Sequence, residues 1–146
     1  MPTLSNDQLA AMSFGYLTGQ DLMNWCPAQL LIKQYEVNSG LLIQGCQSAQ
    51  GEVIRALLSR YAIANEFSNV SGSREIMVVQ ITAILSVRNI MGNMAGVSEH
   101  MKTNFAWATQ TLMDLRNGFI NLILPQADCP NRSSSFLVPQ NFSTLG

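Results

Sequence analysis

The residues of this chain that could carry out chemistry are few, and they lie far apart. His100 is the only histidine, so any acid–base or nucleophilic scheme that uses histidine depends on it alone. It follows Glu99 in the first turn of a predicted helix, and no local motif ties a cysteine or a serine to it. Catalytic partners can converge from distant positions, but the preferred interpretation is a single histidine on the surface.

The acidic residues and the arginines form no catalytic motif either. The nine carboxylates occur singly, so paired acids or a two-metal site would have to be assembled by the fold alone. The sequence contains no phosphate-loop, HExxH or GxSxG motif. Arg88 ends an apolar stretch, and we expect it either to pair with an acid such as Glu52 or Asp114 or to reach past its helix end into solvent.

The cysteines and the N-terminus bear on cofactors and location. Cys26, Cys46 and Cys129 form an odd set with no CxxC pair, which indicates neither a disulfide framework nor a zinc site. We therefore expect no metal, no cofactor and no enzymatic activity. Residues 1–7 lack the features of a signal peptide, and no apolar run approaches the ~20 residues that cross a bilayer, so the cytoplasm is the expected place of synthesis.

Charged residues make up 12% of the chain, about half of the usual ~25%. A free soluble domain normally covers itself with charge, so this composition favours a surface that is partly covered by partners. An uncharged but free surface is the alternative. The net charge of −1 and the scattered basic residues argue against a nucleic-acid interface.

The first forty residues are expected to hold only short elements. Residues 1–16 have no long hydrophobic period and are interpreted as a partly ordered arm. Thr18 fits a helix N-cap with Asp21 in the first turn, and this helix should run through Trp25. A second short helix is predicted from Pro27 to about Gln34.

Three longer helices should form the body of the domain. Apolar residues at three- and four-residue intervals predict an amphipathic helix over about 40–64, in which Gly45 and Gly51 indicate either a close neighbour or simple tolerance. The apolar run 76–87 is long enough to favour a helix over a buried strand. It should be capped by Ser71 or Ser73, end near Gly92 and be buried on several sides. A third helix should begin after Ser98 and end at Gly118.

The C-terminal part of the chain changes character. Residues 119–125 are too short for another long helix and are expected to form an extended segment that pairs or docks. Residues 126–146 are rich in proline, serine and asparagine, yet they retain apolar anchors. The predicted architecture is an all-α bundle of about four helices over residues 1–125, followed by an extended docking tail over 126–146. The predicted docking residues are Phe136, Leu137, Val138 and Phe142.

With these elements in place, residues 17–125 resemble the small helical head–tail connector proteins of tailed bacteriophages, also called adaptor or head-completion proteins. The resemblance rests on four short stretches and on the apolar helix that ends near Arg88. The stretches are Asp21-Leu22, residues 49–61 with Glu52-Val53 and the Leu57-Leu58-Ser59-Arg60-Tyr61 ending, Leu112 to Gly118, and Leu122 with Leu124-Pro125. The family usually has a proline-containing loop after its Arg-Tyr pair, whereas residues 62–65 contain no proline.

The resemblance implies a structural protein of the virion. It implies a homo-oligomeric ring, commonly of twelve subunits, that sits beneath the portal protein at the head–tail junction. Such a ring extends the channel through which DNA passes without sequence-specific binding, and it docks the next tail or neck protein. The tail of residues 126–146 would then reach the portal or an adjacent subunit.

Two other hypotheses remain open on the sequence alone. The first is a small helical DNA-binding transcription regulator, whose DNA binding would weaken steeply with salt. The second is an enzyme with a site that converges from Glu75, Arg88 and His100, which requires a deep polar pocket.

Overall fold

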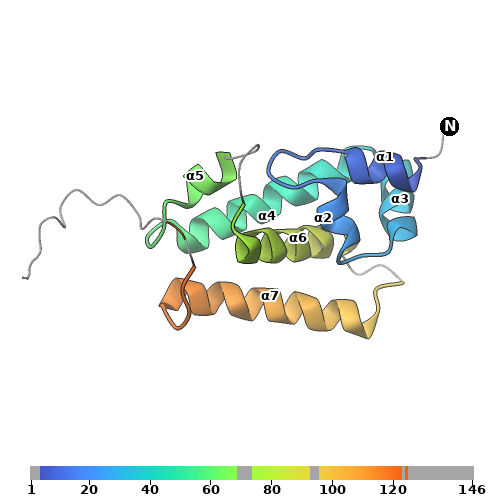
Figure 1. Cartoon of the computed structure of the whole chain (residues 1–146). Coiled ribbons are helices and arrows are strands. Elements are labelled where there is room, and N and C mark those ends of the chain that lie inside the picture. The colour runs from blue at the N-terminus through green and yellow to red at the C-terminus, as the bar shows by residue number, and fades with distance from the viewer. Residues whose placement is uncertain (1–3, 69–73, 93–95, 123, 125–146) are drawn as a thin grey trace, which may run out of the picture.

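A computed structural model describes residues 4–68, 74–92, 96–122 and 124. Over these residues the regular elements are seven α-helices, which confirms the predicted all-α class, and α4, α6 and α7 are the long ones (Figure 1). Their bounds are α1 Asn6–Ala11, α2 Gly19–Met23, α3 Ala28–Val37, α4 Leu41–Leu57, α5 Ile63–Ser68, α6 Ile76–Met91 and α7 Glu99–Asn117. None of the described helices is both long and apolar enough to cross a bilayer.

Helix α6 is the centre of the bundle, as its composition predicted. Ten of its sixteen residues are buried, including every residue from Ile81 to Val87. A helix that is apolar nearly all round must be covered on several sides. It packs against α2, α3, α4 and α7, with α7 running along the lower side of the bundle in Figure 1.

The two glycines of α4 have different roles. A Cβ atom on Gly45 would lie 2.5 Å from the side chain of Ile90 and 3.2 Å from the carbonyl oxygen of Ser86, both on α6. Gly45 therefore allows the backbones of α4 and α6 to approach closely. A Cβ atom on Gly51 would meet only the flexible end of Arg55, so Gly51 is simply tolerated.

The expectation of a partly ordered N-terminal arm is wrong. Ser5 caps α1 in a capping box with Gln8, and Leu9 is fully buried. The chain then reverses through Gly15 at φ 89°, where the Phe14 N–H donates to the Leu17 carbonyl. The apolar residues of this segment lack a helical period because a short helix and a tight turn bring them to the same core.

The predicted 40–64 helix is also wrong in its length. It ends at Leu57, and α5 begins only at Ile63. The break turns the side chains of Arg60 and Tyr61 toward the end of α7. Arg60 donates to the carbonyl of Leu115 in the last turn of α7, which also accepts the Gly118 N–H, and to the carbonyl of Ile120 just beyond the helix.

The caps of the last two long helices are partly as predicted. Glu75 caps α6 by accepting the Met77 N–H at 2.6 Å, which corrects the predicted Ser71 or Ser73; both serines lie outside the described residues. Ser98 caps α7, and Gly118 ends it in the left-handed conformation at φ 83°, as expected.

The segment after α7 docks on its own bundle. Leu122 is buried, and its N–H donates to the Tyr61 hydroxyl at 3.0 Å. Arg60 also donates to the Asn121 side chain at 2.7 Å. The described residues of the predicted 119–125 segment therefore lie against the turn between α4 and α5.

Tyr61→Phe should lower the free energy of unfolding by about 1–2 kcal/mol, because it leaves the buried Leu122 N–H without an acceptor. Urea denaturation measures the loss, and hydrogen exchange should accelerate at Leu122. Tyr35→Phe on α3 is the control, since Tyr35 is only partly buried. Unchanged exchange at Leu122 would contradict the prediction.

Candidate functional site

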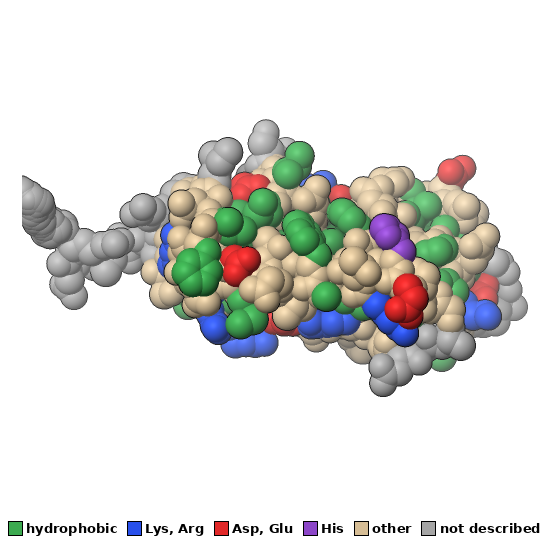
Figure 2. Space-filling model, turned by 90° about the horizontal axis from the view of Figure 1, so that it is seen from below, with side chains coloured by type: hydrophobic (Ala, Val, Ile, Leu, Met, Phe, Trp, Pro, Cys, Tyr) green, Lys and Arg blue, Asp and Glu red, His purple; other side chains and the backbone are tan. Residues whose placement is uncertain are grey.

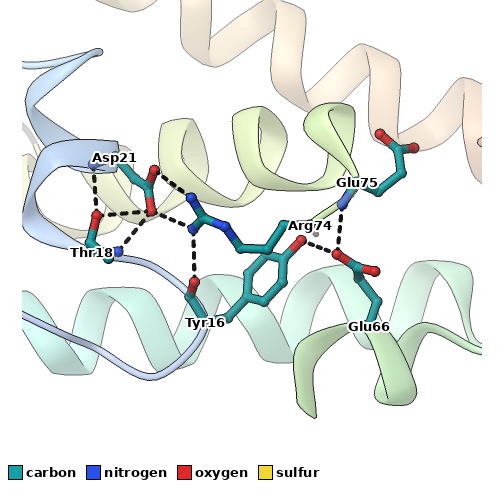
Figure 3. A network of polar contacts seen from close by, with 6 residues as sticks. All are labelled: Tyr16, Thr18, Asp21, Glu66, Arg74 and Glu75. Atoms are coloured by element: carbon teal, nitrogen blue, oxygen red, sulfur yellow. Dashed lines mark hydrogen bonds and ion pairs between the residues drawn. The ribbon is translucent and has the colours of Figure 1, made fainter. Parts of the chain in front are cut away.

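A network of polar side chains joins the N-terminal segment to the start of α6 (Figure 3). Its members come from three separate parts of the chain. Thr18 and Asp21 form the capping box of α2, in which each side chain bonds the backbone N–H of the other. The sequence predicted the Thr18 N-cap with Asp21 in the first turn, and the capping box holds the Asp21 carboxylate toward Arg74, just before α6.

Arg74 and Asp21 form a two-pronged ion pair. The distances are 2.6 Å from Nη1 to Oδ2 and 3.2 Å from Nη2 to Oδ1. The side chain of Asp21 is 10% exposed and that of Arg74 is 29% exposed, so the carboxylate is well shielded from water. Arg74 also donates to the Tyr16 carbonyl at 2.9 Å and lies 5.7 Å from the centre of the Tyr16 ring.

Tyr16 and Glu66 form the other half of the network. The Tyr16 hydroxyl donates to the Glu66 carboxylate, which also accepts the Glu75 N–H at 2.8 Å. Burial, and then the hydrogen bond and charge of Glu66, raise the pKa of the Tyr16 phenol far above its usual value. Tyr16 therefore stays protonated as a donor. The network, which we call the polar lock, joins residues 16–21 to Glu66, Arg74 and Glu75.

The lock should make stability depend on pH in the acid range. Burial raises the pKa of the Asp21 carboxyl, but hydrogen bonds from Arg74 and Thr18 outweigh it and hold this pKa below its ordinary 3.8. The ionised Asp21 carboxylate therefore contributes fully to the free energy of unfolding above pH 3.8. This contribution is lost as the pH falls through the pKa that Asp21 has in the folded chain. Denaturation at pH 7 and in steps below pH 4 should show this loss, and Asp21→Asn should reduce it. An identical acid profile for Asp21→Asn would contradict the assignment.

The candidate catalytic residues are not brought together. Glu75 and Arg88 lie at opposite ends of α6, about 20 Å apart at 1.5 Å per residue. Arg88 pairs with Glu52 of α4 at 2.6 Å, which confirms the first of its two predicted interpretations. His100 is exposed at the start of α7, as expected for a single surface histidine.

The two described cysteines are poor nucleophiles. Cys26 and Cys46 are buried and unpaired, and burial raises the pKa of their thiols to about 12 and about 11. In the part of the chain that the structure describes, no group of three His, Cys, Asp or Glu residues could hold a metal ion. Cys129 lies outside the described residues.

The predicted docking residues Phe136, Leu137, Val138 and Phe142 also lie outside the described residues. The described surface nevertheless carries large apolar side chains that the other described residues leave exposed. Figure 2 shows the face formed by α7, on which hydrophobic side chains are spread between polar ones and Lys and Arg side chains follow one long edge. The large exposed apolar residues of the described chain are Val37, Ile43, Leu58, Ile76, Trp107, Met113 and Phe119.

A groove of about 230 Å³ lies between α4 and α7. Ala56, Leu112 and Met113 contribute apolar surface, and Arg55 and Arg116 contribute positive charge. Glu52 also lines the groove, but its carboxylate is engaged by Arg88. The groove therefore combines apolar surface with the positive charge of two arginines that form no ion pair with a described residue, a surface complementary to acidic and apolar groups.

The chain matches no protein-family model, and comparison with curated proteins and with solved structures found no similar protein.

Sequence reasoning missed most of the polar lock. The Tyr16–Glu66 and Arg74–Asp21 contacts join residues 50 and 53 positions apart, so no local spacing relates them. The only signal was the Thr18–Asp21 capping box, which accounts for one acidic residue of the network. Arg60 was part of the family resemblance, but its role as a clamp on the end of α7 required the fold.

Proposed function

We propose that this chain is a structural virion protein, a head–tail connector that assembles as a ring below the portal. The observation that carries the proposal is a helical bundle with several large apolar side chains left uncovered on its surface. Trp107 and Met113 on α7 are each 42% exposed, and Phe119 just beyond it is 77% exposed. Several large apolar side chains exposed on a weakly charged surface are typical of an assembling subunit.

The proposed mechanism is assembly without a chemical step. The ring extends the DNA channel, and the described helices supply its wall by packing side by side around the axis. Residues 126–146 lock onto the portal or an adjacent subunit, and the next tail or neck protein docks on the opposite side. The proposed location is accordingly the head–tail junction of the virion.

The experiment that tests the proposal is a native mass by light scattering, followed by negative-stain imaging of any large species. We expect a ring for the chain alone or for the chain mixed with portal protein. A chain that stays monomeric and does not bind portal protein would contradict the proposal.

The docking tail has its own test. Replacing Phe136 and Leu137 by serine should weaken ring assembly or portal binding at least tenfold, because the proposed anchors lose their apolar contacts (about 1.4 kcal/mol per factor of ten). Replacing Ser133 and Ser134 by alanine is the matched control in the same tail. The circular dichroism of both variants should equal that of the parent chain. Equal assembly of the two variants would contradict the docking role of Phe136 and Leu137.

A DNA-binding regulator is the second candidate, favoured by one observation. Arg55, Arg60, Arg88 and Arg116 lie on or beside the α4–α7 edge, although two of them are engaged by protein groups. Nonspecific DNA binding through this edge would weaken with salt. Fluorescence anisotropy with duplex DNA at 50 and 200 mM salt separates this function from the connector, which should bind free duplex weakly.

A further inference from the structure

We propose that the α4–α7 groove of one copy receives the C-terminal end of α3, Glu36 and Val37, from a second copy. This inference rests on the proposed function and deepens it, because it names the two surfaces through which neighbouring subunits contact each other.

The receiving surface is basic and partly apolar. Arg55 and Arg116 are both exposed, and neither forms an ion pair with any described residue. Met113 is 42% exposed beside them, and Leu112 and Ala56 line the groove more deeply. Because Arg88 already neutralises Glu52, two guanidinium groups remain to attract an incoming carboxylate.

The inserted surface has the complementary chemistry. Val37 is 75% exposed at the end of α3, which makes it one of the most exposed apolar side chains of the described chain. Glu36 precedes it, is exposed, and has no ion-pair partner among the described residues. Ile43, 39% exposed in the first turn of α4, adds apolar surface at the same end of the bundle.

The two surfaces cannot meet within one copy. α3 is followed directly by α4, so Glu36 lies near the start of α4, whereas the groove is lined by residues 52–56 near its end. The distance along α4 is about 16–22 Å at 1.5 Å per residue. A contact between different surfaces at opposite ends of a subunit is head-to-tail, and such contacts repeat into a ring when the rotation closes.

The neighbouring charges affect the strength of this contact. Lys33 is exposed one turn before Glu36 on α3 and has the same sign as the groove. Asp114, on α7 near the groove, is partly buried and accepts a hydrogen bond from Gln110. The charge of Glu36 therefore favours insertion into the basic groove, whereas the charge of Lys33 opposes it.

Charge reversal in the full chain tests the proposal. Glu36→Arg, and separately Arg55→Glu with Arg116→Glu, should each weaken self-association at least tenfold, and the three changes together should restore it. Lys33→Glu is the matched control on the same helix and should leave association at least as strong as in the parent. Sedimentation velocity over a range of concentrations at low salt measures association, and circular dichroism checks that each variant is folded.

A second measurement locates the contact directly. Copies with Val37→Cys are mixed with copies with Met113→Cys, both with Cys129→Ser, and are oxidised; Cys26 and Cys46 are buried and should not react. Starting from equal amounts of the two variants, the heterodimer should clearly exceed the sum of the two homodimers. A heterodimer no more abundant than that sum, which is the result of random pairing, or charge reversals that do not change association, overturn the inference while leaving a ring through another face possible. A chain that is monomeric at every concentration also overturns it, and the connector proposal is then decided separately by portal binding.

Discussion

Gly19→Ala should lower the free energy of unfolding by about 3 kcal/mol or more. A Cβ atom at this position would lie 2.6 Å from the carbonyl carbon of Leu9 and even closer to its oxygen. Overpacking usually costs about 1–3 kcal/mol, and the upper end applies here because the obstacle is backbone rather than a flexible side chain. Gly19 N–H also donates to the Met12 carbonyl at 2.9 Å, so α1 and α2 would have to separate.

The matched control for this substitution is Gly51→Ala in α4, at a half-buried position. There the new methyl group meets only the end of Arg55, and the higher helix propensity of alanine should add up to about 1 kcal/mol. Urea denaturation followed by circular dichroism measures both variants. Equal stability of the two variants would show that α1 does not pack on α2 as the structure describes.

Arg74→Met should cost about 3 kcal/mol of unfolding free energy. The change leaves the Asp21 carboxylate, 10% exposed, without its cation, and removal of one partner of a buried pair typically costs 3–5 kcal/mol. We expect the low end of that range because the Arg74 side chain is 29% exposed. The hydrogen bond to the Tyr16 carbonyl is lost as well.

Arg88→Met provides the comparison for Arg74. The Arg88–Glu52 pair has the same 2.6 Å distance, but its side chains are about one-third exposed, so its loss should cost at most about 1 kcal/mol. Adding Asp21→Asn to Arg74→Met should recover part of the stability, because no unpaired buried charge remains. Equal losses for Arg74→Met and Arg88→Met would contradict the importance of burial at Asp21.

Helices with a continuous local signal were predictable from the sequence. The apolar run of α6, the Ser98 cap and Gly118 end of α7, and the Thr18–Asp21 capping box each lie within a few residues, so the local pattern was sufficient. The break after Leu57 was not predictable, because the apolar spacing continues through Tyr61. At the break, Arg60 donates to the carbonyls of Leu115 in α7 and of Ile120 beyond it, and these contacts depend on how the distant α7 packs.

The α4–α7 groove and the other candidate binding surfaces were harder to predict from the sequence than the helices. The sequence correctly indicated that Arg88 could pair with Glu52, since both lie on predicted helices. It could not indicate that Arg55 and Arg116 share a groove, because sixty residues separate them and the contact depends on how α4 packs against α7. The docking role of Phe136, Leu137, Val138 and Phe142 stays a prediction.

The polar lock, which joins residues 16–21 to Glu66, Arg74 and Glu75, also affects how the chain folds. Its bonds join residues 50 and 53 positions apart, whereas most contacts of a helical bundle are local. Such non-local contacts slow folding, because the chain must close a long loop before they form. During synthesis, the bond between Asp21 and Arg74 can form only after Arg74 has left the ribosome. At about 5–20 residues per second, this happens several seconds after α2 has been synthesised.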